Sequence, residues 1–146
     1  MVAGCNTAGS PESYIWMSNI NFLSPDSRCR SFDHRANGYA RGEGVGVVLL
    51  KRLSDAIRNG NPIRAVIRSA ASNEDGRTPG ITQPSGVAQE RLIKETYRKA
   101  GLSMSHTRFF EAHGTGTAIG DPREALAIGS SFRNYRSAED PLYVYD

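Results

Sequence analysis

Residues 109–122 constrain the fold most, because a short apolar run, a glycine-rich loop and a helix-start pattern follow one another there without a break. Phe109 and Phe110 predict a buried strand, residues 111–117 (EAHGTGT) a loop, and residues 121–122 (DP) the start of a helix. A histidine at the carboxyl end of a strand, before such a loop and a helix, lies where open α/β sheets bind ligands. The segment therefore predicts an α/β fold with a candidate site at His113.

The residues alone leave two interpretations of this loop open. It is either a ligand site, whose glycines allow close backbone approach and whose threonine hydroxyls donate or accept hydrogen bonds, or a tight strand-to-helix connection with a hydrogen-bonded histidine. A phosphate-binding loop is disfavoured, because the spacing matches neither G-x-G-x-x-G nor G-x-x-x-x-G-K-[ST].

Strand and helix patterns alternate along the rest of the chain. Strands are predicted at residues 2–5, 45–50, 63–68, 108–112 and 142–145, the first two buried, and helices at 53–59, 85–100 and from 121 toward 132, with a helical turn or two within 15–20. Asp121 as N-cap, Pro122 as the first helical residue and Glu124 two positions later predict a capping box. This alternation predicts an α/β fold with a sheet that is at least partly parallel.

Composition narrows the classes of function. The 146 residues suffice for one core but not for two ordinary domains, and the 18 basic and 15 acidic residues are scattered, which argues against a nucleic-acid partner. No apolar run is long enough for a membrane helix, and the start of the chain lacks a signal-peptide pattern. Cys5 and Cys29 fit neither a disulfide framework nor a metal site, and a reducing, cytoplasmic setting is expected. Cys5 is expected to be buried, and Cys29 and His34 to lie in a surface loop.

A resemblance to a known family favours the ligand site. Residues 111–117 with Gly-Asp-Pro at 120–122 resemble the first histidine motif of β-ketoacyl synthases, in the form found in type I polyketide synthases of the fungal, iterative, highly reducing type. Further segments resemble the same family: residues 23–26 (LSPD), 29–33 (CRSFD), 38–44 (GYARGEG) and 73–76 (NEDG). The resemblance spans residues 2–144.

This resemblance implies a partial thiolase-like fold of αβαβα layers, with about residues 1–70 forming the end of the N-terminal half of a ketosynthase domain and about 71–146 the start of its C-terminal half. It implies decarboxylative Claisen condensation of acyl and malonyl thioesters, with His113 as the first of two catalytic histidines. Thr115 and Thr117 match threonines that contact phosphopantetheine. Glu124 matches a carboxylate that helps to hold a catalytic lysine network, although a role as a helix-capping residue is equally compatible.

The resemblance also implies cofactors and partners. No cofactor is bound directly; the substrates are carried on the phosphopantetheine of an acyl carrier protein domain. Other polyketide synthase domains are expected as partners, and the complete domain is expected to be a homodimer. The loop next to the NEDG segment is either part of the acyl or pantetheine channel or simply a solvated loop.

The family's Ala-Cys-Ser nucleophile motif and its Lys-x-Asn-x-Gly-His motif are not within these residues, so the chain holds one member of a Cys-His-His triad. Because such residues act as one unit, the chain alone is expected to lack condensing activity. Open strand edges are expected to make it marginally stable. An inactive remnant that binds carrier protein or pantetheine remains an alternative; a serine hydrolase is disfavoured, because G-x-S-x-G is missing.

Overall fold

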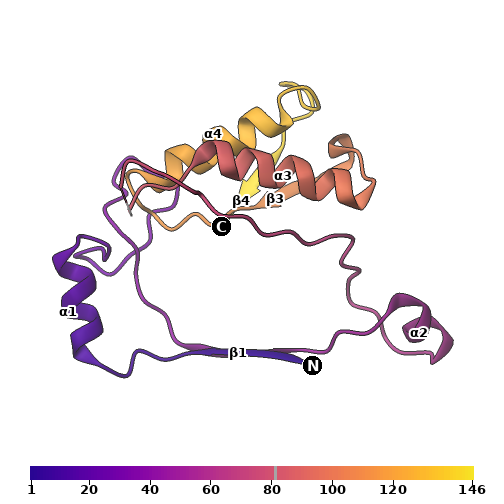
Figure 1. The fold of residues 1–146 in the computed structure, drawn as a ribbon, viewed down its shortest axis with the longest axis horizontal. Helices are drawn as coiled ribbons and strands as arrows, with labels where there is room; N and C mark the ends of the chain where they lie inside the picture. The colour runs from indigo at the N-terminus through magenta and orange to yellow at the C-terminus, as the bar shows by residue number, and fades with distance from the viewer. Residues whose placement is uncertain (81) are drawn as a thin grey trace.

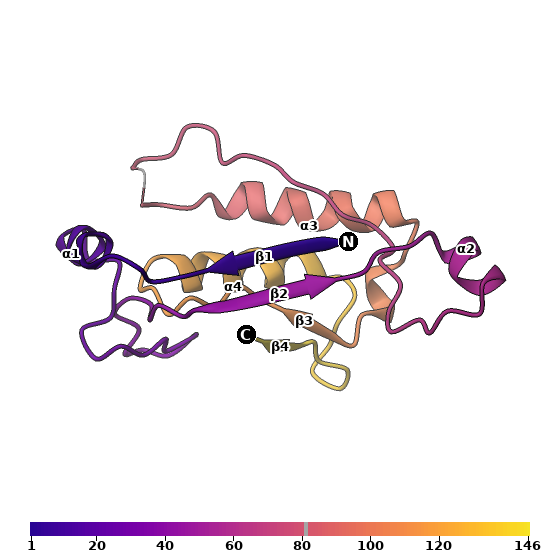
Figure 2. The same cartoon turned by 90° about the horizontal axis from the view of Figure 1, so that it is seen from below.

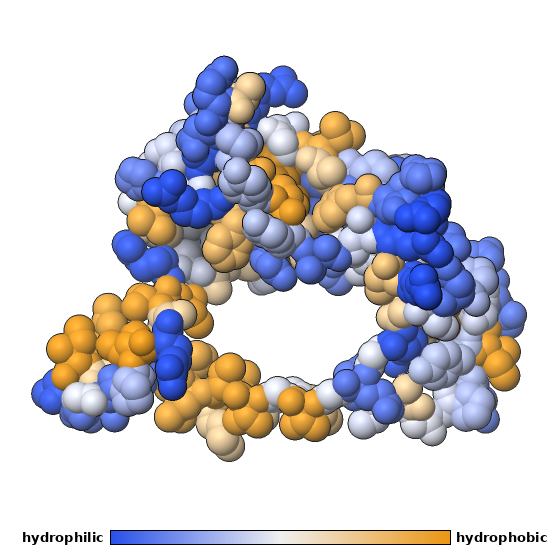
Figure 3. All heavy atoms as spheres, turned by 180° about the vertical axis from the view of Figure 1, so that it is seen from behind, coloured by the Kyte–Doolittle hydropathy of each residue, from blue (hydrophilic) through white to orange (hydrophobic). Residues whose placement is uncertain are grey.

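The computed structural model describes residues 1–80 and 82–146. Its elements are, in order, β1 (Val2–Asn6), α1 (Pro11–Asn19), β2 (Gly44–Val48), α2 (Leu53–Arg58), α3 (Gly86–Ala100), the 3-10 turn η1 (Met104–His106), β3 (Phe109–Glu111), α4 (Gly120–Phe132) and β4 (Tyr143–Tyr145). They form an open ring, in which the β1–β2 ribbon lies opposite a lobe of α3, α4, β3 and β4 (Figure 1). The space-filling view shows an opening through the molecule between the ribbon and the lobe (Figure 3).

The ribbon forms from the two apolar runs that predicted strands near residues 2–5 and 45–50. They pair antiparallel, from Val2 opposite Val48 to Asn6 opposite Gly44, so the first strand does have a partner. The prediction that both are buried is wrong: Val45 is 79% exposed, and the side chains of both strands are exposed throughout. Among the described residues no helix packs on either face of this ribbon. Figure 2 shows its two strands side by side.

The predicted strand at residues 63–68 does not form. The segment is irregular, and Ile67 is 69% exposed. Alternating apolar residues favour a strand only when a neighbouring strand satisfies its N–H and C=O groups, and within the described residues this segment has no such neighbour.

The core lies in the lobe, between α3, α4 and the β3–β4 pair. Phe132 at the end of α4 is 2% exposed and makes edge-on contacts with Tyr97 of α3 and Phe110 of β3, at ring-centroid distances of 5.8 and 6.0 Å. Met104 and Ile128 complete the buried cluster. The apolar face of α4 therefore fixes the end of β3, which leads into the candidate site.

Helix α3 confirms the prediction at residues 85–100, and its ends have the expected local causes. The Ser85 hydroxyl accepts a hydrogen bond from the Ala88 N–H at 3.2 Å, and Gly101 ends the helix with φ of +62°. The preceding loop is tied to this helix start, because the Asp75 carboxylate accepts a bond from the Ser85 N–H at 3.2 Å and the Asn73 amide donates to the Ala88 carbonyl at 2.7 Å.

Strands β3 and β4 pair in parallel, from Phe109 opposite Tyr143 to Glu111 opposite Tyr145, which confirms that the sheet is partly parallel. The β3 strand is only partly buried: Phe110 faces the core, whereas Phe109 is 60% exposed, contrary to the expectation that both are buried. Successive side chains of a strand point to opposite faces, so one helical layer covers only one of the pair.

Three side chains outside the lobe were assigned from the sequence. Cys5 is exposed, which corrects the expectation that it is buried, because it lies on the uncovered ribbon. Cys29 and His34 are exposed loop residues, as expected. None of the helices in residues 1–80 and 82–146 is long and apolar enough to span a bilayer.

Candidate functional site

His113 lies directly beyond the carboxyl end of β3, and its backbone is held by Glu124 of α4. One Glu124 carboxylate oxygen accepts the His113 N–H at 2.7 Å and the other accepts the Gly114 N–H at 3.0 Å. The imidazole is exposed and makes no hydrogen bond to any described residue. The structure thus fixes the main chain on both sides of His113 and leaves its ring available.

Asp121 holds the next part of the loop. This carboxylate, only 3% exposed, accepts the N–H groups of Gly116 and Thr117 at 3.1 Å and that of Phe32 at 2.8 Å. The prediction that Asp121 is the N-cap of a capping box is wrong, since α4 begins at Gly120 with Ile119 as N-cap. The Asp121 carboxylate accepts hydrogen bonds from the loop and from a distant segment, and it does not accept one from the N–H groups at the start of α4.

Glu124 likewise does not cap the helix. It lies beyond the first turn of α4, and both of its oxygens are bound to the loop, so the capping interpretation is wrong. The capping-box prediction is wrong at Asp121 and Glu124 for the same reason, because both carboxylates accept hydrogen bonds from N–H groups of the loop that precedes α4. Each Glu124 oxygen keeps a second lone pair for a further donor.

The two threonines differ in their surroundings. The Thr117 hydroxyl accepts the Gly120 N–H at 3.2 Å and thereby supports the start of α4, while its own hydrogen stays free to donate. Thr115 is half-buried, and its hydroxyl has no partner among the described residues. The structure therefore brings His113, Thr115, Thr117 and Glu124 together in one loop and its supporting helix turn.

Two loop glycines are required by backbone geometry. Gly114 has φ of +46° and Gly116 has φ of +76°. A Cβ at Gly116 would lie 2.6 Å from the Arg30 nitrogen, and one at Gly114 would lie 3.3 Å from the Phe32 ring. Only glycine fits both the left-handed backbone and the close approach of the segment around residues 29–32.

Gly116→Ala is expected to lower the free energy of unfolding by about 3 kcal/mol, because it combines an unfavourable φ with a clash against backbone that cannot easily move. Denaturant unfolding measures this change. Gly129→Ala is the matched control, since a Cβ there meets nothing within 4 Å and alanine favours a helix by roughly 1 kcal/mol. Equal effects from the two substitutions would contradict the packing described.

A second loop, residues 29–38, packs against this one. The Ser31 hydroxyl donates to the Gly114 carbonyl, and the Gly38 N–H donates to the Gly116 carbonyl at 3.0 Å. Phe32 itself has a positive φ of +57°. Sequence analysis placed these residues in two segments that resemble the family, 29–33 and 38–44, but gave none of them a role at the site. Ser31 and Phe32 act through partners more than 80 positions away, which no local pattern reveals.

Two ion pairs lie in and beside the second loop, Arg30 with Asp26 and Arg35 with Asp33. Hydrogen bonds from the Ser24 hydroxyl and then from Arg30 lower the pKa of Asp26 to about 2. Hydrogen bonds from Arg35 hold the pKa of Asp33 well below its ordinary value. Both carboxylates therefore stay ionised above pH 4, and any contribution they make to the loop is lost only as the pH falls through these lowered values.

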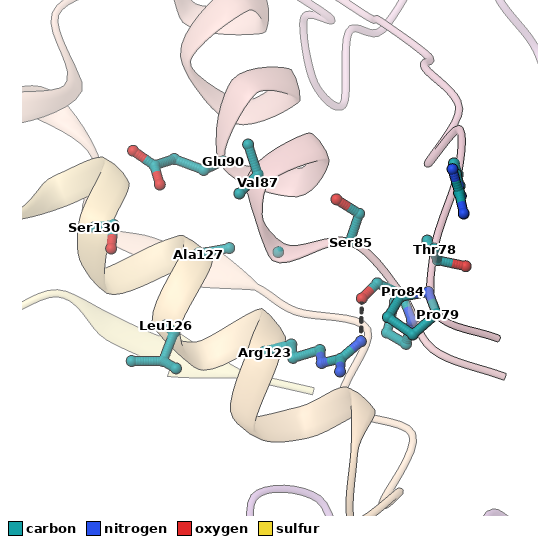
Figure 4. Close-up of a pocket in the computed structure, with 12 residues that line it drawn as sticks. Thr78, Pro79, Pro84, Ser85, Val87, Glu90, Arg123, Leu126, Ala127 and Ser130 are labelled. Carbon is teal, nitrogen blue, oxygen red and sulfur yellow. Dashed lines mark hydrogen bonds between the residues drawn. The ribbon is translucent and has the colours of Figure 1, made fainter.

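Several hollows lie along α4, and two of them bear on the candidate site and on the segment that supports it. One of about 430 Å³ lies beside the site, where Phe32, His34, Thr117, Asp121 and Ala125 border it. The other, of about 370 Å³, lies between α3 and α4 away from His113 (Figure 4). There Arg123 donates to the Pro84 carbonyl at 2.6 Å and to the Gln83 side chain at 2.9 Å, which ties α4 to the segment before α3. Of these two hollows, the first adjoins residues of the candidate site.

Among the described residues no three His, Cys, Asp or Glu side chains are grouped to hold a metal ion. The N–H groups of His113, Gly114, Gly116 and Thr117 already donate to Glu124 and Asp121, so the donors that the loop presents are the imidazole and the two threonine hydroxyls. These groups can donate hydrogen bonds to an oxygen that becomes negatively charged.

Residues 1–56 match the family described as beta-ketoacyl synthase, N-terminal domain, and residues 64–145 the family described as beta-ketoacyl synthase, C-terminal domain. The chain is 58% identical over 144 residues to highly reducing polyketide synthase 40 of Fusarium mangiferae, and 59% identical to highly reducing polyketide synthase NEC1 of Pyricularia oryzae. The matches cover 99% of this chain but only 6% and 5% of those proteins.

Solved structures agree. The ketosynthase from module 6 of the bacillaene synthase of Bacillus subtilis 168 is 40% identical, with a TM-score of 0.89 over 92% of this chain and 24% of its own. The oxazolomycin ketosynthase domain KS7 of Streptomyces albus JA3453 has a TM-score of 0.92 at 38% identity, over 98% of this chain and 26% of its own. These matches confirm the predicted resemblance and the partial thiolase-like α/β fold.

Proposed function

The chain belongs to the β-ketoacyl synthase family, and from this premise we propose that it is part of a condensing domain that catalyses decarboxylative Claisen condensation in a highly reducing polyketide synthase. A malonyl thioester would lose CO₂, and the electron pair of the broken C–C bond would pass into an enolate. The enolate carbon would attack an acyl thioester held on a cysteine of the domain, expelling the thiolate. The products are a carbon chain longer by two carbons and CO₂.

In this proposal His113 donates a hydrogen bond to the enolate oxygen. A preorganised donor in such a position is worth about 100- to 1,000-fold in rate, because it stabilises charge that develops only in the transition state. The observation that carries the proposal is the pair of hydrogen bonds from the His113 and Gly114 N–H groups to Glu124. They hold the backbone still and leave the imidazole free for a substrate.

The neighbouring residues would bind the substrate arm. Thr115 and Thr117 are proposed to donate hydrogen bonds to the phosphopantetheine of an acyl carrier protein, and the free hydroxyl of Thr115 supports this role. Glu124 is proposed to accept a further bond from a catalytic lysine through its remaining lone pairs. The carrier protein and other synthase domains are the proposed partners, and the complete domain is proposed to be a homodimer in the cytoplasm.

The proposal is tested with the complete ketosynthase domain that contains this sequence, supplied with acyl-loaded and malonyl-loaded carrier protein. We expect a 3-ketoacyl product from that domain and none from the 146-residue chain alone, because the chain holds one member of the triad. A complete domain that binds both carriers but forms no product would contradict the proposal. Sustained product from the chain alone would show that the division of catalytic roles is wrong.

A further inference from the structure

Three hydrogen bonds join the second loop to the histidine loop and its supporting aspartate. Two come from backbone amides: Phe32 N–H donates to Asp121 at 2.8 Å, and Gly38 N–H donates to the Gly116 carbonyl at 3.0 Å. The third comes from a side chain, the Ser31 hydroxyl, which donates to the Gly114 carbonyl. Among these three bonds, the one from Ser31 is the bond whose donor is a side chain, so a substitution at Ser31 removes it.

The carbonyl that Ser31 holds belongs to the residue next to His113. Gly114 is buried and has φ of +46°. Because glycine has no Cβ, its backbone can adopt more conformations than that of any other residue unless hydrogen bonds hold it. The Gly114 N–H donates to Glu124 at 3.0 Å, and the Gly114 carbonyl accepts a hydrogen bond from the Ser31 hydroxyl. With both ends held, Gly114 cannot change conformation without breaking a bond to Ser31 or to Glu124.

We infer that Ser31 is a positioning residue for His113: by holding the Gly114 carbonyl, it sets the direction in which the imidazole meets the substrate. The inference rests on the proposed function, in which His113 donates to the enolate oxygen. The Ser31 hydroxyl is bonded to the Gly114 carbonyl and not to the imidazole, so it acts through the Gly114 backbone. The amide bonds from Phe32 and Gly38 do not depend on the Ser31 hydroxyl, so the loops stay docked when it is removed.

Ser31→Ala in the complete domain is expected to lower kcat about 10-fold, with the KM for malonyl-loaded carrier protein unchanged and the thermal midpoint lowered by only about a few degrees, because a single hydrogen bond to the Gly114 carbonyl is lost. Ser31→Thr restores the hydroxyl and is expected to recover kcat to within about two-fold. Ser54→Ala is the matched control, because Ser54 is an exposed serine of α2 whose hydroxyl has no partner among the described residues. It is expected to behave as the unsubstituted domain.

Hydrogen exchange measures the same claim without turnover. In Ser31→Ala, peptides that cover residues 113–117 are expected to exchange about 10-fold faster, whereas the exchange rate of α3 peptides should not change. In Ser31→Thr, peptides that cover residues 113–117 are expected to exchange at the unsubstituted rate. Unchanged exchange at residues 113–117, or unchanged kcat in an active domain, overturns the role of Ser31. If the unsubstituted domain is inactive, the proposed function fails by itself, and exchange alone then decides whether Ser31 holds the histidine loop.

Discussion

Replacing His113 with alanine is expected to lower the condensation rate of the complete domain by at least about 100-fold, the effect of removing one preorganised donor to a developing oxyanion. The thermal midpoint should not change. The His113 ring is exposed and unbonded among the described residues, and surface substitutions of this kind usually change stability by less than about 0.5 kcal/mol. A large loss of rate with no loss of stability separates a role in chemistry from a role in folding.

The measurement compares kcat and the thermal midpoint of His113→Ala with those of His106→Ala. His106 is an exposed histidine of η1, which precedes β3 in the chain. His106→Ala therefore removes an imidazole at a position away from the histidine loop. We expect His106→Ala to retain full activity. A loss of less than about five-fold for His113→Ala would show that its N–H does not stabilise the transition state.

Asp121→Ala is expected to have the largest effect on stability, lowering the free energy of unfolding by about 3–5 kcal/mol. It leaves the N–H groups of Gly116, Thr117 and Phe32 without their acceptor in a site where the aspartate is only 3% exposed. Each buried donor without a partner costs roughly 1–3 kcal/mol, and only part of this cost is recovered by water that enters the space. Both loops would loosen together.

Urea unfolding of the complete domain measures this change. Asp55→Ala serves as the control, because Asp55 forms an ion pair with Arg58 at 2.6 Å on the surface of α2, and such pairs contribute about 0–1 kcal/mol. Destabilisation by Asp121→Ala no greater than that of the control would mean that its three N–H partners do not hold the loops together.

The elements that the sequence predicted well are those whose causes are local. Ser85 and Gly101 set the ends of α3, and a serine N-cap and a left-handed glycine act on the residues next to them in the chain. The candidate site was predicted for a similar reason: strand, histidine, glycine-rich loop and helix are consecutive. The family resemblance then assigned roles within that short segment.

The predictions that failed depend on contacts far apart in the chain. Asp121 has all the local features of an N-cap, but it accepts a hydrogen bond from Phe32, 89 positions away, and from the loop before the helix. The Ser31 contact with Gly114 spans 83 positions and was missed for the same reason. A capping pattern describes which donors are near in sequence and not which donors the fold brings closer.

The predictions that strands are buried were wrong for a different reason. An apolar run such as residues 45–50 indicates that a strand is covered in its folded setting, but not what covers it. In the chain described here Val45 and Leu49 are 79% and 83% exposed. The opening seen in Figure 3 lies beside this ribbon, and the chain spans about a quarter of the solved ketosynthases that it matches.

Release of CO₂ from malonyl-loaded carrier protein tests the central claim most directly, because it isolates the step in which the enolate forms. The complete domain is compared with its His113→Ala variant, both loaded with an acyl group. If His113 stabilises the enolate oxygen, CO₂ release falls by the same factor as condensation, about 100-fold or more. If CO₂ release continues at the unsubstituted rate while condensation stops, His113 does not act on the enolate, and the proposed role of the loop is wrong.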